Sequence, residues 1–132
     1  MNALRPLRFP HASIALWLMM FAVVTVGSLL PARDVPTPPF PGFDKLEHMI
    51  GYAVLSAYAV LLFATGRARL LALAAVIAFG CGIEIAQGLF TTTREPDVLD
   101  ALANAAGAVI GQGVGLLPVA RWLERDAFRR TA

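Results

Sequence analysis

The sequence has few charged residues and only one cysteine. Charged residues make up 15% of its 132 residues and hydrophobic residues 58%, and the mean hydropathy is +0.67. A chain this apolar is not an ordinary soluble domain, so we interpret it as one membrane domain. The single Cys81 lies inside an apolar stretch. An intrachain disulfide and a cysteine-rich metal site are therefore excluded, and the redox compartment cannot be inferred.

Familiar enzyme motifs are also missing. The sequence contains no nucleophile elbow, no H-E-x-x-H pair and no phosphate-binding glycine loop. Its net charge of +2 is carried by short basic clusters between apolar runs rather than by a continuous polar face. This pattern indicates membrane topology rather than nucleic-acid binding.

Four apolar runs are long enough to cross a bilayer core of about 30 Å, which takes about 20 helical residues. They cover residues 12–30, 46–65, 68–90 and 98–120. A cleavable signal peptide is the alternative for the first run, because Arg5 and Arg8 precede it. That run is long, however, and no A-x-A cleavage site follows it, so we expect a retained helix.

The connections between these runs define the topology. Residues 31–43 hold five of the nine prolines and predict a stiff loop without regular structure. Residues 66–67 and 91–97 join the later runs, and such short connections require antiparallel neighbours. The sequence therefore predicts an all-α fold, a membrane-spanning antiparallel bundle of four transmembrane helices.

Basic residues are unequally divided between the two ends of the predicted bundle. Eight lie at the end that carries both termini: Arg5, Arg8, Arg67, Arg69, Arg121, Arg125, Arg129 and Arg130. Three lie at the other end: Arg33, Lys45 and Arg94. By the positive-inside rule, residues 1–11 and the basic tail 121–132 are cytoplasmic, and the domain 12–120 exposes its loop 31–43 outside. Seven of the nine acids lie at the external end, where we expect any chemistry.

The second run opens with a charged turn. Asp44 followed by Glu47 is a capping-box pattern, and capping is either the whole role of these two acids or only part of it. Lys45 is the only lysine in a chain with ten arginines. Its ammonium suits a phosphate or a carboxylate, and snorkelling toward the head groups explains it equally well.

Polar side chains continue down the second and third runs. His48, Tyr52 and Ser56 share one helical face, which should contact protein or water rather than lipid. His48 is either a hydrogen-bonded packing residue or a functional ionisable group. Glu84 is the strongest single indication of a functional site. Placing an acid at mid-bilayer costs about 2.5–3.5 kcal/mol of insertion free energy unless the acid is paired, hydrated or protonated. Gln87 shares its face, and an interhelical hydrogen bond is the simpler explanation of both.

Close helix packing is predicted for the third and fourth runs. Gly80 and Gly88, one turn either side of Glu84, allow another helix to approach. The fourth run has one face that is polar at its external end and glycine-rich toward the cytoplasm. Its acids are also explained by the helix dipole after Pro96, and its glycines by packing alone. This face consists of Asp97, Asp100, Asn104, Gly107, Gly111 and Gly115.

Three polar motifs follow one another along the chain. They are Asp44-Lys45-x-x-His48-x-x-x-Tyr52, Glu84-x-x-Gln87, and Arg94 followed by Asp100-x-x-x-Asn104-x-x-Gly107-x-x-x-Gly111. Over roughly residues 43–113 this series resembles the VanZ-like family of bacterial membrane proteins. The resemblance implies a multi-pass protein of the bacterial inner membrane. It also implies a link to antibiotic resistance of the teicoplanin type.

Three functions remain open at this point. In the first, an outward-facing polar cleft binds an anionic lipid-linked component of the cell envelope through Lys45, Tyr52, Gln87, Arg94 and Asn104. In the second, His48, Glu84 and Asp100 are catalytic residues of a membrane-embedded enzyme acting on a lipid phosphate or acyl group. In the third, the chain oligomerises and transports a solute coupled to protons. We assign no metal ligands, because one histidine with two acids is a weak set; if a metal binds, we expect Mg²⁺, Mn²⁺ or Ca²⁺ before zinc.

Helical rise places the polar residues in two layers at the external end. His48, Gln87 and Asp100 form the upper layer, and Tyr52, Glu84 and Asn104 the lower layer. The layers converge on one outward-opening cleft if the three polar faces turn toward one another. Lys45 and Arg94 would then lie at its mouth, and the first helix would mainly screen lipid.

The predicted orientation is tested by reporter fusions. A reporter that is active only outside the cytoplasm should stay inactive when fused after Ala132, because the basic residues hold both termini inside. The same reporter inserted after Phe40 should be active. Activity at Ala132 would overturn the assignment.

Overall fold

The computed structural model describes residues 3–93 and 95–118, which form four long helices. These are α1 (Pro10–Leu29), α2 (Phe43–Leu62), α3 (Gly66–Phe90) and α4 (Val98–Gln112). Two short 3₁₀ helices, η1 (Ala32–Asp34) and η2 (Gly113–Leu116), follow α1 and α4, and the described residues contain no strand beyond one isolated bridge. The predicted all-α fold class is confirmed. The predicted basic tail 121–132 and the last residues of the fourth predicted run lie outside the described residues.

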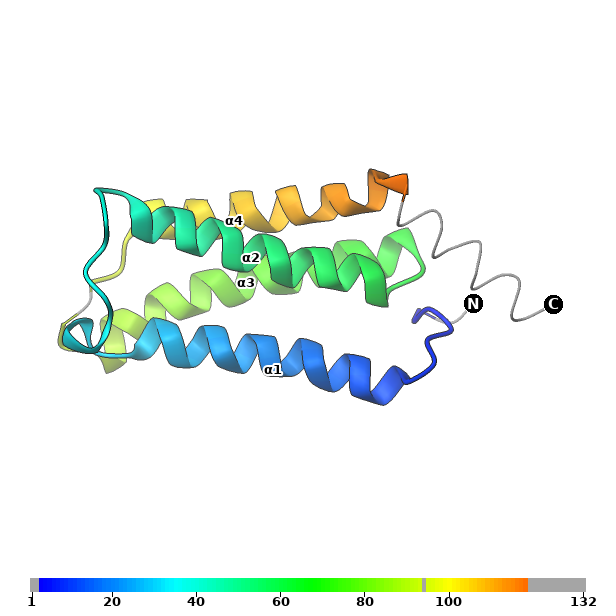
Figure 1. Cartoon of the computed structure of the whole chain (residues 1–132), viewed down its shortest axis with the longest axis horizontal. Coiled ribbons are helices and arrows are strands. Elements are labelled where there is room, and N and C mark those ends of the chain that lie inside the picture. The colour runs from blue at the N-terminus through cyan, green and yellow to red at the C-terminus, as the bar shows by residue number, and fades with distance from the viewer. Residues whose placement is uncertain (1–2, 94, 119–132) are drawn as a thin grey trace.

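The helices run up and down along one long axis (Figure 1). The connections α1–α2 and α3–α4 lie together at one end, which we call the loop end. The α2–α3 connection, the residues that precede α1 and the end of η2 lie at the opposite end, which we call the terminal end. Each helix is therefore antiparallel to the next in sequence, as short connections require.

Three of these helices, α1, α3 and α4 continued by η2, are long and apolar enough to cross a membrane. The helix α2 is 20 residues long, as α1 is, but it carries Asp44, Lys45 and Glu47 at its loop end. It also has six buried residues, whereas α1 has none. We therefore describe α2 as the fourth helix of a membrane bundle, with one face buried against the other helices.

Glycines bring α2 and α4 into backbone contact. A β-carbon at Gly107 would overlap the carbonyl oxygen of Met49, and one at Gly111 would overlap that of Ala53. Gln112 Nε2 also donates to Ser56 Oγ at 2.8 Å. Small residues permit this approach, which fixes the α2 polar face against the α4 polar face.

The helix α1 packs on α2 and α3 through aromatic side chains. Trp17 Nε1 donates to the carbonyl of Leu55 at 3.0 Å. The ring of Phe21 lies edge-on to Trp17, with centroids 5.1 Å apart, and to Phe79, at 4.7 Å. The preceding segment is also anchored, since the Arg5 amide donates to Leu62 and Arg5 Nε to Val60, both backbone carbonyls.

The start of α2 differs from the capping box that the sequence suggested. The helix begins at Phe43, and its N-cap is Gly42 with φ of 83°, a left-handed conformation that glycine adopts without strain. No side chain caps this end. Asp44 lies inside the first turn and is not the N-cap, and its carboxylate bonds to the Lys45 ammonium. The capping-box explanation of Asp44 and Glu47 is therefore wrong.

Replacement of Gly107 by leucine should strongly destabilise the bundle. The side chain has no space beside the Met49 carbonyl, and overpacking of this kind costs about 1–3 kcal/mol or more. The matched control is Gly82→Leu on α3, where a β-carbon meets nothing within 4 Å. Thermal unfolding in detergent, followed by circular dichroism, measures both. Equal stability of the two variants would show that α4 does not meet α2 through this glycine.

Candidate functional site

Lys45 links α2 to the start of α4 at the loop end. Its Nζ donates to Asp97 Oδ2 at 2.8 Å, to Asp100 Oδ1 at 3.0 Å and to Asp44 Oδ2 at 3.1 Å. An ammonium has three donors, so this arrangement uses all of them. Lys45 therefore binds the chain's own carboxylates, whereas the sequence placed it at a cleft mouth as a cation for an external anion.

Asp97 has two structural roles at the N-terminus of α4. Its Oδ1 accepts a hydrogen bond from the amide of Leu99 at 2.8 Å, which caps the helix, while Oδ2 accepts from Lys45. These bonds, that of Lys45 first, hold the pKa of the Asp97 carboxyl below its ordinary value. The helix dipole therefore explains only part of the role of Asp97 in the structure. Its ion pair with Lys45 of α2 explains the other part.

His48 faces α4 one turn below Lys45. Its Nδ1 lies 3.0 Å from Asn104 Oδ1, and its Nε2 lies 3.9 Å from Asp100 Oδ2, beyond hydrogen-bond distance. An amide oxygen only accepts, so in this orientation of Asn104 the proton is on Nδ1. A neutral His48 then presents the Nε2 lone pair to the side where Asp100 lies.

Glu84 reaches the same place from α3. Its side chain is buried and its Oε2 accepts from the backbone amide of Asp97 at 3.2 Å. Its Oε1 is buried without a hydrogen-bond partner among the described residues. His48, Glu84 and Asp100 each offer one ligand atom, and these atoms lie within 4.8 Å of one another. We call these three residues the His48–Glu84–Asp100 cluster.

Two further polar side chains lie near this cluster with hydrogen-bonding capacity to spare. Tyr52 and Asn104 are each 1% exposed. The Tyr52 hydroxyl and Asn104 Nδ2 have no partner within the part of the chain that the structure describes. Gly80 makes room for both, since a β-carbon there would lie 2.9 Å from Tyr52 Cε1 and from Asn104 Cβ. Buried donors of this kind normally bond to water or to a ligand.

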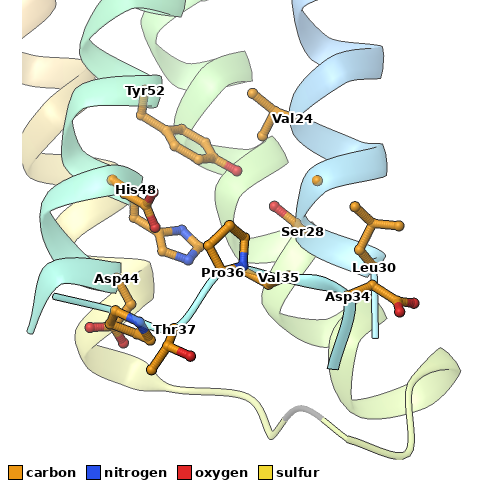
Figure 2. Close-up of a pocket in the computed structure, with 14 residues that line it drawn as sticks. Val24, Ser28, Leu30, Asp34, Val35, Pro36, Thr37, Asp44, His48 and Tyr52 are labelled. Atoms are coloured by element: carbon orange, nitrogen blue, oxygen red, sulfur yellow. The ribbon is translucent and has the colours of Figure 1, made fainter. Parts of the chain in front are cut away.

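A cavity of about 710 Å³ adjoins these side chains at the loop end. Figure 2 shows His48 and Tyr52 projecting from α2 toward α1, which contributes Val24 and Ser28 to the opposite wall. The α1–α2 connection crosses between them at Pro36. The α1 wall of the cavity is thus apolar apart from Ser28, and the α2 wall is polar and includes the carboxyl groups of Asp44 and Glu47.

The structure brings together four of the predicted site residues, His48, Glu84, Asp100 and Asn104, with Tyr52 lining the adjacent cavity. Their roles as catalytic or ligand-binding residues stay predictions. Gln87 is turned away from them, because its Nε2 donates to the backbone carbonyl of Ser28 on α1 at 3.0 Å. Arg94, the other predicted ligand-binding residue, lies outside the described residues.

One expectation about arrangement was wrong. Glu84 was placed a layer below His48 and Asp100, but its long side chain reaches the backbone amide at the start of α4 and joins them. The first helix was expected mainly to screen lipid, and α1 has no buried residue, but it also forms one wall of the cavity. Ser28, a polar residue near the end of an otherwise apolar run, is the signal in the sequence that was overlooked.

The family model for VanZ/LLP1 matches residues 4–119, a stretch that includes every residue of the cluster and of the cavity. The resemblance seen in the polar motifs is thereby confirmed. No curated protein and no solved structure matches the chain.

Substitution of Lys45 by methionine should lower the melting temperature by several degrees. It leaves three carboxylates close together without the ammonium that they share. Arg33→Met is the control, because the side chain of Arg33 is 82% exposed. Adding Asp97→Asn to Lys45→Met should restore part of the loss by removing one of the repelling charges. Unchanged melting of Lys45→Met in detergent at low salt would contradict this account.

Proposed function

The chain belongs to the VanZ/LLP1 family, and we propose that it binds the head group of a lipid-linked component of the cell envelope at the loop end of its bundle. The observation that carries this proposal is the cavity with one apolar and one polar wall. In the proposed orientation, with both termini in the cytoplasm of a bacterial cell, the cavity opens toward the outer leaflet.

The two walls of the cavity suit an amphiphile. Its volume of about 710 Å³ falls within the usual range for small-ligand sites, which is about 300–1,000 Å³. That space holds a head group and the first part of a chain, but not a whole lipid. The head group would lie against His48 and Tyr52, and the chain would leave along the apolar surface of α1 beside Val24 and Leu30.

A phosphate is the head-group chemistry that a neutral donor in the cavity favours. The Tyr52 hydroxyl belongs to a residue that lines the cavity, and it is a buried donor whose capacity is unused by the described residues. Phosphate oxygens accept such bonds well. The positive charge expected from Lys45 is already shared among three carboxylates. An anionic head group therefore needs a further cation at this site.

The proposed ligand also gives the teicoplanin link a physical meaning. A protein that holds a lipid-linked wall precursor at the outer leaflet would restrict the access of a glycopeptide to that precursor. Resistance would then follow from binding alone, with no bond made or broken.

A membrane-embedded enzyme is the second candidate, favoured by the convergence of the His48–Glu84–Asp100 cluster. An imidazole and two carboxylates whose ligand atoms lie within 4.8 Å are groups suited to moving a proton to or from a phosphate or acyl substrate. Release of inorganic phosphate or fatty acid from added lipid by the purified protein, lost in Glu84→Gln, would select the enzyme over the binding protein.

Lipid retained by the natively purified protein tests the binding proposal. We expect mass spectrometry to find a phosphate-bearing lipid at about one per chain. Tyr52→Phe should lower this occupancy about three- to tenfold, the effect of one hydrogen bond, and Gly27→Leu should block the cavity that Gly27 lines. Tyr58→Phe and Gly82→Leu are the matched controls. Retained lipid that mirrors the bulk membrane, alike in all variants, would contradict the proposal.

A further inference from the structure

We propose that His48, Glu84 and Asp100 form a binding site for one divalent cation, and that Mn²⁺ suits it. The three side chains come from three different helices, α2, α3 and α4, and each offers one ligand atom within 4.8 Å of the others. Such convergence of one imidazole and two carboxylates inside an apolar bundle is costly unless a positive charge joins them.

The buried Glu84 carboxylate points independently to a ligand. Glu84 is 5% exposed, and its Oε1 has no hydrogen-bond partner among the residues that the structure describes. A buried carboxylate oxygen with no donor carries an uncompensated desolvation cost. A cation bonded to Oε1 removes that cost.

Each proposed ligand is held through its other polar atom. Asn104 Oδ1 bonds to Nδ1 of His48, which leaves Nε2 free to coordinate. The Asp97 amide bonds to Oε2 of Glu84, which leaves Oε1. Lys45 bonds to Oδ1 of Asp100, which leaves Oδ2. Partners of this kind fix the orientation of ligands in metal sites.

The distances require only small side-chain rotations. Ligand atoms at about 2.1 Å from one ion lie about 3 Å from each other. His48 Nε2 and Asp100 Oδ2 are 3.9 Å apart, somewhat farther than two ligand atoms of one ion. Small changes in the side-chain torsion angles would bring them to that distance. The backbone of the bundle need not move.

The ligand set and the local charge favour Mn²⁺. Mn²⁺ is coordinated by carboxylate oxygen and imidazole nitrogen together. Ca²⁺ prefers six to eight oxygen ligands, and structural zinc prefers more nitrogen or sulfur ligands. Around the cluster there are four carboxylates, of Asp44, Glu84, Asp97 and Asp100, and one ammonium, of Lys45, which bonds to the three aspartates. A divalent ion offsets most of this negative charge.

The cation would also supply the positive charge that a phosphate head group needs, and in this part the inference rests on the proposed function. Three protein ligands leave coordination positions open, and His48 lines the cavity in which the head group would lie. The cation site itself does not depend on the lipid, so the two are tested apart.

The competing explanation is a protonated His48. An imidazolium would donate from both nitrogens, to Asn104 and to Asp100, and would lower the negative charge without a metal. The folded protein would then bind no divalent cation at this place.

Binding of Mn²⁺ to the chelator-treated, full-length protein in detergent decides between these explanations. Electron paramagnetic resonance follows the loss of the free Mn²⁺ signal, and we expect about one ion per chain. Glu84→Gln and His48→Gln should each weaken binding at least about tenfold. Glu95→Gln, an exposed acid two residues before Asp97, should bind as the unchanged protein does. Size-exclusion profiles and helicity establish that each variant is folded.

A second measurement needs no variant of the cluster. Pulsed paramagnetic resonance on bound Mn²⁺ should detect one directly coordinated imidazole nitrogen, and this signal should persist in His11→Gln, since His11 and His48 are the only histidines. Absence of nitrogen coordination, or no binding of Mn²⁺, Zn²⁺, Mg²⁺ or Ca²⁺ at millimolar concentration, would overturn the proposal. Mn²⁺ binding by a protein that retains no specific lipid would support the cation site while rejecting the lipid ligand, and the reverse result would reject the cation alone.

Discussion

A carboxylate buried among membrane-spanning helices must find a compensating partner, and the loop end of this bundle is organised around that requirement at Glu84. Glu84 reaches from α3 to the backbone amide of Asp97, which caps α4 and pairs with Lys45 of α2. One buried acid is thereby connected to polar groups on both other helices of the cluster. Removing Lys45 would leave three carboxylates without the ammonium that they share.

This network depends on how closely the helices approach. Contact between the backbones of α2 and α4 at Gly107 and Gly111 sets the rotation of both helices, so that His48 and Asn104 meet at 3.0 Å. Gly80 on α3 leaves the space that Asn104 and Tyr52 occupy. The helix α1 then encloses the cavity beside them. Small residues thus position a polar site that larger ones would separate, which joins the packing of the bundle to its proposed function.

Periodicity made much of this predictable. Runs of apolar residues gave the four helices, and steps of three and four residues indicated that His48, Glu84 and Asn104 belong to inward faces. Which partners each side chain takes was not predictable, because that depends on helix rotation and side-chain reach. Lys45 therefore proved to bind three acids, Gln87 proved to bond to α1, and Glu84 proved to join the residues nearer the loop end. The role of α1 was missed because its sequence is almost uniformly apolar.

The central claim is that polar residues of separate helices act as one coupled cluster, and a double-mutant cycle on His48→Gln and Glu84→Gln tests it most directly. Unfolding free energies in detergent would be measured for both single variants and for the double variant. Residues that share a cluster should show a coupling of about 0.5–3 kcal/mol. The pair His11→Gln and Glu84→Gln, with His11 exposed at the far end of α1, should be additive. Additivity of His48 with Glu84, within about 0.5 kcal/mol, would contradict the claim.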